Sequence, residues 1–100
     1  MKLGILVNTD RHLDAVTGLA GAALAKGHEV IIFTMDEGTR LFKDPAYAAL
    51  CSLQGVTMSF CDLSTKTLGI DGGGLPDEIV CGSQYNNASM VHEADKVIVL

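Results

Sequence analysis

Short apolar runs alternate along this chain with segments whose apolar residues recur at helical spacing, and that alternation constrains the fold more than any other feature. Continuous apolar or β-branched runs are typical of strands that are buried on both faces of a sheet. Such runs occupy residues 2–8, 29–34, 56–60, 78–81 and 95–100. Strands that alternate with helices form βαβ units. The sequence therefore predicts an α/β fold, a three-layer α/β/α arrangement around a mostly parallel five-stranded sheet.

Between these runs the sequence carries the start and stop signals of helices. Asp10 is the predicted cap of the first helix. After an expected turn at residues 35–39, Pro45 opens a second helical segment that ends at Gly55. The later helices are expected at residues 61–69 and 83–94, with a loop at residues 71–77. No repeat or linker divides the chain, so residues 1–100 are expected to form one domain.

Composition excludes several classes of partner. The formal net charge is −5 and the seven Lys and Arg residues are scattered, whereas a nucleic-acid or anionic membrane surface needs clustered positive charge. The longest uncharged apolar stretch, residues 15–25, is too short to span a bilayer, and the start of the chain does not resemble a signal peptide. Three cysteines without CxxC spacing indicate neither a disulfide framework nor a zinc ribbon. We expect a cytoplasmic protein with no nucleic-acid or membrane partner.

The predicted architecture has one edge at which ligands bind, outside the carboxyl ends of the parallel strands. The chemically capable side chains that follow the strands at this edge are His12, Asp36, Cys61, Asp62 and Cys81. His28 and His92 belong to the opposite edge and are expected to be surface or packing residues. Cys51 shares a predicted helix face with two apolar residues, so we expect it in the core. Two thiols, Cys61 and Cys81, are left at the ligand edge.

Several common catalytic motifs are missing from that edge. The first strand is followed by residues 8–14 without a glycine-rich turn, so the sequence has neither a dinucleotide fingerprint nor a P-loop. The three cysteines are widely spaced, unlike the ligands of a typical metal site, and no motif supports a Ser-His-Asp triad. Neither a metal nor an organic cofactor is expected.

Cys61 is placed where a thiol gains acidity. It stands at the junction of the third strand and a short helix, whose first N–H groups and dipole favour a thiolate. Asp62 adds an opposing negative charge, and Lys66, one turn further on, is placed to pair with it. Asp62 and Ser64 are alternative caps, which would leave the sulfur outside the turn. A cysteine that only fills space at a strand end is the other interpretation of this junction.

Three segments of the chain carry a family resemblance: FTMDEGTRLF after the second strand, CDLSTKTLGI from Cys61 onward, and GSQYNNASMVHEADKVIVL at the end. Together they resemble the DsrE/DsrF-like family, the group that includes the DsrEFH and TusBCD sulfur-relay proteins. The segment FTMDEGTRLF resembles the turn after the second strand, where family members often carry an acidic residue and a glycine. The segment CDLSTKTLGI resembles the family's active-site pattern, a strand-end cysteine followed eight residues later by Gly-Ile or Gly-Val, here Cys61, Gly69 and Ile70. The segment GSQYNNASMVHEADKVIVL resembles the closing helix and strand. The resemblance spans the full length of the chain.

This resemblance implies a sulfur carrier, or persulfide-based sulfurtransferase, that needs no cofactor. In family members that carry the cysteine, it accepts a sulfane sulfur as a persulfide and passes it on, which implies this role for Cys61 with sulfur donor and acceptor proteins as partners. The resemblance also implies a homo-oligomer, a trimer or hexamer, or an assembly with related subunits. This chain departs from the family pattern in its two additional cysteines and in Lys66–Thr67, where arginines are common.

Two other functions stay open at the level of sequence. One is a non-catalytic oligomeric binding or scaffold subunit of the same fold, in which Cys61 is buried and inert. The other is a thiol redox protein that uses Cys61 and Cys81. If the third and fourth strands are neighbours, their spacing is compatible with a disulfide, and Cys81 is then placed to resolve a persulfide on Cys61. The simpler alternative is that Cys81 packs beneath the loop.

Overall fold

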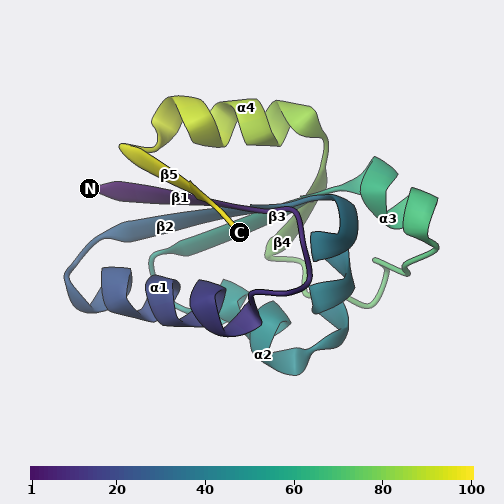
Figure 1. The fold of residues 1–100 in the computed structure, drawn as a ribbon, viewed down its shortest axis with the longest axis horizontal. Helices are drawn as coiled ribbons and strands as arrows, with labels where there is room; N and C mark the ends of the chain where they lie inside the picture. The colour runs from purple at the N-terminus through teal and green to yellow at the C-terminus, as the bar shows by residue number, and fades with distance from the viewer.

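Residues 1–100 of the computed structural model form a five-stranded sheet with helices on both of its faces (Figure 1). The strands are β1 (Lys2–Val7), β2 (Glu29–Thr34), β3 (Val56–Cys61), β4 (Ile79–Gly82) and β5 (Lys96–Val99). They lie in the order β4-β3-β2-β1-β5, and every neighbouring pair is parallel. The predicted α/β/α fold is confirmed, and its sheet is parallel throughout.

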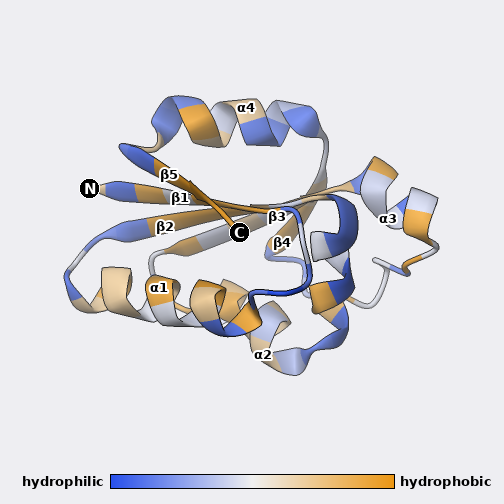
Figure 2. Ribbon diagram, in the orientation of Figure 1, coloured by the Kyte–Doolittle hydropathy of each residue, from blue (hydrophilic) through white to orange (hydrophobic).

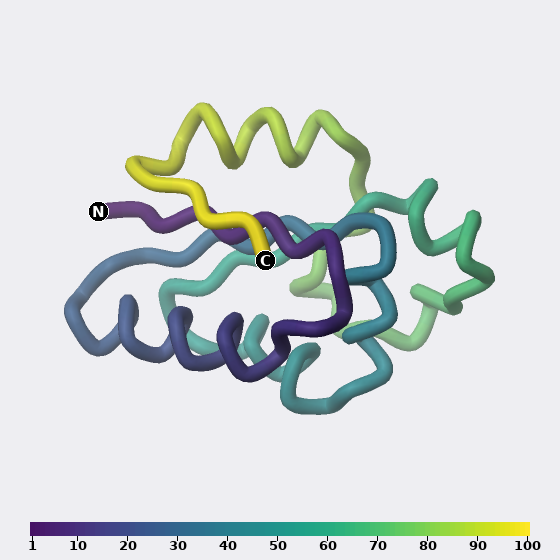
Figure 3. The backbone as a smooth tube through the Cα atoms, viewed as in Figure 1, coloured from purple at the N-terminus to yellow at the C-terminus, as the bar shows by residue number.

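The helices are divided unequally between the two faces of the sheet. They are α1 (Leu13–Ala25), α2 (Pro45–Ala48), α3 (Asp62–Leu68) and α4 (Gln84–Glu93), with two 3-10 helices, η1 (Asp36–Lys43) and η2 (Ala49–Ser52). In Figure 1, α1 and α2 cover one face and α4 alone covers the other. The backbone trace in Figure 3 shows α3 beyond the ends of the strands. No helix is both long enough and apolar enough to cross a membrane.

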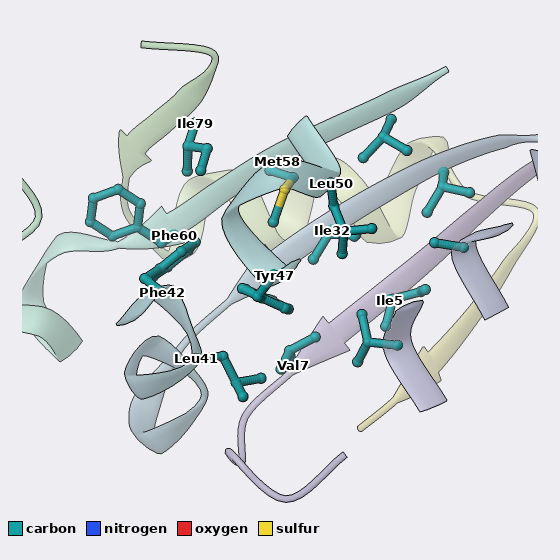
Figure 4. Close-up of a cluster of buried hydrophobic side chains, with 14 of the residues drawn as sticks. Ile5, Val7, Ile32, Leu41, Phe42, Tyr47, Leu50, Met58, Phe60 and Ile79 are labelled. Atoms are coloured by element: carbon teal, nitrogen blue, oxygen red, sulfur yellow. The ribbon is translucent and has the colours of Figure 1, made fainter. Parts of the chain in front are cut away.

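The main core lies between the sheet and the layer that contains α1 and α2. Its 15 buried residues include alternate residues of each central strand, such as Ile5 and Met58 (Figure 4), because successive strand residues point to opposite faces. Phe42 packs edge-on against Tyr47 and Phe60, with ring centroids 5.3 and 5.5 Å apart. The hydropathy colouring of Figure 2 shows this apolar content along the central strands.

A smaller apolar cluster lies on the other face, beneath α4. Its buried members are Phe33, Cys61 and Met90, and the half-buried Leu6, Ile31 and Met35 pack against them. Cys61 belongs to this cluster whereas its neighbour Phe60 belongs to the main core. The sheet therefore separates Cys61 from most of the core.

The start of α1 differs from the prediction. The helix begins at Leu13 with His12 at the cap position and no capping hydrogen bond from a side chain, so the prediction that Asp10 caps it is wrong. The Thr9 hydroxyl organises this segment instead: it donates to the Leu100 carbonyl at 3.0 Å and accepts from the Arg11 N–H at 3.5 Å. These bonds tie the segment before α1 to Leu100, and the helix begins further along than the sequence predicts.

The predicted turn at residues 35–39 is instead the start of η1. Asp36 has a positive φ of 49°, and Gly38 packs so closely against Val7 that a Cβ at this position would collide with the Val7 carbonyl. The second predicted helix is also interrupted. Asp44 caps α2 by accepting the Ala46 N–H at 2.9 Å, but after Ala48 the chain tightens into η2, as helix ends often do.

Candidate thiol site

Strand β3 ends and helix α3 begins at one residue, Cys61. It is the last residue of β3 and occupies the cap position of α3, with extended backbone angles of φ −83° and ψ 112°. At the other end of α3, Gly69 adopts the left-handed conformation, with φ 69°, which favours glycine because it lacks a Cβ. The predicted junction of strand, cysteine and helix is confirmed.

The Cys61 side chain is covered by its neighbours. Only 5% of the residue is exposed, and it packs with Phe33 and Met90. Its partner across the sheet is Gly82 of β4, the residue that leads into α4. The thiol therefore lies among apolar side chains, between β2, β3 and the start of α4.

Two opposing influences act on the acidity of this thiol. Burial raises the pKa of Cys61, but donors from Ser64, Gln84 and the Leu63 N–H outweigh burial and lower the pKa below the ordinary thiol value. The Ser64 hydroxyl and backbone N–H both contribute to this lowering. The thiol makes no side-chain capping hydrogen bond at the start of α3. The net effect favours a thiolate.

Ser64 is held in place by the turn after β2. Its hydroxyl oxygen accepts the Asp36 N–H at 2.9 Å, and the residue is 8% exposed. Because the oxygen is occupied as an acceptor, the O–H remains available to donate toward Cys61. The positive φ of Asp36 turns its N–H toward α3, so the strained turn and the thiol site are directly linked.

Asp62 and Lys66 form an ion pair on the outer surface of α3. Their side-chain atoms lie 2.7 Å apart, in the spacing of one helical turn. The hydrogen bond from Lys66 lowers the pKa of Asp62, and the same bond raises the pKa of Lys66. The predicted pairing is confirmed, and it partly neutralises the carboxylate next to Cys61.

The structure does not bring Cys61 and Cys81 together. Strands β3 and β4 are neighbours, but Cys81 pairs with Phe60 and Cys61 pairs with Gly82. Because adjacent residues of a strand point to opposite faces, the two thiols lie on opposite sides of the sheet. All three cysteines are free.

Cys81 instead opens onto a separate cavity of about 700 Å³ between α3 and the loop at residues 71–77. Asp62 and Lys66 also line this cavity. Desolvation of the sulfur, followed by the Asp62 carboxylate, raises the pKa of Cys81. Cys81 is exposed, so it differs from Cys61 both in access and in acidity.

The remaining predicted residues lie away from the sulfur of Cys61. His12 is exposed and precedes α1, on the opposite face of the sheet. Asp36 lines a second cavity, of about 580 Å³, together with Ser64. Cys51 is half-buried against the main core, and burial followed by the Glu78 carboxylate raises its pKa. No three His, Cys, Asp or Glu side chains come together in a way that would hold a metal ion.

Two residues near the sulfur were not singled out from the sequence as its side-chain donors, Ser64 and Gln84. The position of Ser64, three residues after Cys61, was a usable signal because a side chain there reaches back to the cap. Gln84 had no such signal. It approaches Cys61 only because β4 pairs with β3, and strand order cannot be read from one sequence.

Comparison with known proteins places the chain in a family. A family model described as the DsrE/DsrF-like family matches residues 1–100. The fold is similar to the crystal structure of the ychN protein from E. coli, with a TM-score of 0.72, 16% identity and coverage of 99% of this chain and 97% of that chain. It is also similar to MTH1491, a protein of unknown function from Methanobacterium thermoautotrophicum, with a TM-score of 0.77, 15% identity and coverage of 99% and 98%. No curated protein matches the chain. Since the family model covers every residue, the chain belongs to the DsrE/DsrF-like family.

Proposed function

We propose that this protein is a sulfur carrier that accepts a sulfane sulfur as a persulfide on Cys61 and passes it to a partner protein. The observation that carries the proposal is the setting of Cys61, a strand-end thiol at the start of a helix whose pKa is lowered despite burial. A low-pKa thiol is what such a reaction requires, because the thiolate is the nucleophile. Membership of the DsrE/DsrF-like family supports the same chemistry.

The proposed transfer uses two displacement steps. In the first, the Cys61 thiolate attacks the outer sulfur of a donor persulfide, forming the new S–S bond while the donor's own S–S bond breaks. The donor leaves as a thiolate, and Cys61 carries the terminal sulfur with its proton. In the second, a thiolate of the acceptor attacks that terminal sulfur and releases Cys61 as a thiolate. No electrons are gained or lost overall.

The covered position of Cys61 suits a carrier that must protect its cargo. Persulfides react with oxidants and with free thiols, and a cysteine residue that is only 5% exposed is shielded from both. The exposed side chains around it, Leu63 and Gln84, form the rim that a donor must displace. Transfer is therefore coupled to docking of the partner.

We also propose that the protein is a homo-oligomer, a trimer or hexamer, or assembles with related subunits. Helix α4 packs mainly on the three central strands β1, β2 and β3, so the edge strands β4 and β5 are less covered on that face. Val80, Val97 and Val99 are between 39% and 57% exposed there, and Tyr85 and Val91 are exposed on α4 itself. An apolar surface of this kind is typical of an interface.

A second candidate function is a non-catalytic scaffold subunit of the same fold. The observation that favours it is the low exposure of Cys61, which is the property expected of a packing residue. The sheet register gives no support to the third candidate, a redox protein with a Cys61–Cys81 disulfide, because the two side chains point to opposite faces.

The carrier and scaffold functions are separated by treating the protein with a small-molecule persulfide and locating the added sulfur by mass spectrometry. We expect a gain of one sulfur atom on Cys61 and its transfer to a thiol acceptor added afterwards. A Cys51→Ser/Cys81→Ser variant should behave as the natural chain does, and Cys61→Ser should not load. If Cys61 takes up no sulfur while the fold is intact, the scaffold function is correct.

A further inference from the structure

We propose that Gln84 is a positioning donor for the sulfur of Cys61 and that Asn87 fixes the orientation of the Gln84 amide. This proposal rests on the proposed carrier role of Cys61, whose sulfur it would serve. It assigns a function to the first turn of α4, which the sequence resemblance leaves without one. The argument depends on sheet register, on two hydrogen bonds and on one unpaired atom.

The fold delivers Gln84 to the end of β3. Cys61 pairs with Gly82 across the sheet, and Gln84 follows Gly82 by two residues as the first residue of α4. A capping box formed by Ser83 and Asn86 fixes the start of this helix. A side chain at Gly82 would collide with the Asn86 amide, so the chain turns into α4 immediately above Cys61.

The hydrogen bonds of Gln84 determine which end of its amide faces the sulfur atoms. Asn87 donates from Nδ2 to Gln84 Oε1 at 3.1 Å, which occupies the oxygen. Gln84 Nε2 then donates to Met35 Sδ at 3.7 Å. Met35 packs against the cluster that contains Cys61, so the donor nitrogen is turned toward that cluster.

Asn87 keeps an unpaired atom in this arrangement. Its Oδ1 is buried and has no hydrogen-bond partner, although buried polar atoms are paired in the great majority of cases. The amide therefore satisfies its nitrogen on Gln84 and leaves its oxygen without a partner. An apolar residue at this position would avoid that cost, and the orientation of Gln84 is what the asparagine provides in return.

The electrostatic surroundings leave room for a neutral donor. Gln84 lowers the pKa of Cys61, acting alongside Ser64 against the effect of burial. Of the charged groups at this edge, Asp62 and Lys66 are paired with each other on α3, and Asp36 and Glu37 belong to η1. The first turn of α4 carries no acidic residue. Cys81 of β4 faces the other side of the sheet.

A side-chain donor reaches positions at the rim of the site that a backbone N–H of α3 cannot reach. On loading, the negative charge of the Cys61 thiolate leaves with the donor thiolate, and the terminal sulfur of the persulfide becomes the outermost acceptor of the site. The backbone N–H groups of α3 are fixed at the start of the helix, whereas the Gln84 side chain holds its donor at the exposed rim of the site. We infer that Gln84 stabilises both the empty thiolate and the loaded persulfide.

The test measures the thiol pKa of Cys61 from the pH dependence of its alkylation, in the Cys51→Ser/Cys81→Ser background. Gln84→Met keeps the size of the side chain but removes the donor, so alkylation below the thiol pKa should slow about threefold to tenfold. Gln84→Lys restores a donor and should return the pKa to the parent value or below. Asn87→Ala should raise the pKa, and in the Gln84→Met/Asn87→Ala variant its effect should disappear. Ala88→Ser, on the exposed side of α4, is the matched control.

These measurements separate the inference from the function on which it rests. An unchanged Cys61 pKa in Gln84→Met, in a protein that still loads sulfur on Cys61, overturns the role of Gln84 and leaves the carrier intact. A raised pKa in a protein whose Cys61 never loads sulfur overturns the carrier and supports the Gln84 contact. Additive effects of the Gln84 and Asn87 substitutions overturn the orienting role of Asn87.

Discussion

At the scale of single residues, the chemistry of this protein depends on a thiol that is covered and yet acidified. Burial alone makes a cysteine inert, because it disfavours the thiolate. At Cys61 the donors gathered from α3 and α4 reverse that effect. The largest of these contributions comes from the Ser64 hydroxyl, which the Asp36 N–H holds in place.

Replacement of Ser64 by alanine should therefore raise the pKa of Cys61. We expect alkylation of Cys61 at neutral pH to slow by about threefold to tenfold, since one hydrogen bond to a charged group is lost. Thr67→Ala is the matched control, because it removes a hydroxyl from an exposed position on the same helix. Equal effects of the two substitutions would contradict the role of Ser64.

The same substitution should change how stability depends on pH. A thiol whose pKa is lower in the folded state than in the unfolded state stabilises the fold above the ordinary thiol pKa of about 8.5. That contribution is lost as the pH falls through the lowered folded value. In the Cys51→Ser/Cys81→Ser background, the free energy of unfolding should rise with pH across this window, and less steeply in Ser64→Ala. A fall with rising pH would contradict the assignment.

At the scale of elements, η1 is the part of the structure that positions α3, and Gly38 allows η1 to pack closely against β1. A Cβ at Gly38 would collide with the carbonyl of Val7 in β1. Because η1 carries the Asp36 N–H that holds Ser64, any displacement of η1 reaches the thiol site.

Gly38→Ala should destabilise the protein by about 1–3 kcal/mol, the usual cost of overpacking, and should also raise the pKa of Cys61. Gly18→Ala is the control: it lies in the middle of α1 with open space around it, where alanine stabilises a helix by about 1 kcal/mol. Urea unfolding measures both changes. A Gly38→Ala protein as stable as the natural chain would show that η1 does not depend on this close contact.

The sequence predicted the elements whose pattern is local and missed those that depend on tertiary contact. The strands were predictable because burial on both faces leaves continuous apolar runs, and Cys61 was predictable as a junction because β3 is such a run. The helix η1 was missed because it forms against the backbone of β1, which no local pattern reports. The opposite orientation of Cys61 and Cys81 was missed because it follows from the pairing register of β3 with β4, which one sequence does not report. The approach of Gln84 to Cys61 was missed for the same reason.

At the scale of the whole molecule, the unequal division of helices leaves one face of the sheet incomplete. The register of β4 and β5 places their exposed valines on the face of the sheet that carries α4. An exposed apolar surface of this kind is typical of an interface, and a second copy of the chain is the occupant that we propose.

Sedimentation at micromolar concentration should therefore find an oligomer. Val99→Asp places a charge on the uncovered face and should shift the protein toward the monomer, while Leu53→Asp places one at an exposed site after η2 and should not. A natural chain that sediments as a monomer would contradict the proposal of a homo-oligomer.

The placement of Cys61 and Cys81 on opposite faces of the sheet also gives the molecule a natural attachment point for a spectroscopic reporter. A fluorophore coupled to the exposed Cys81 would sit beside Asp62 and Lys66. The sheet would separate the dye from the sulfur of Cys61. Its emission would register movements of α3 when another protein docks.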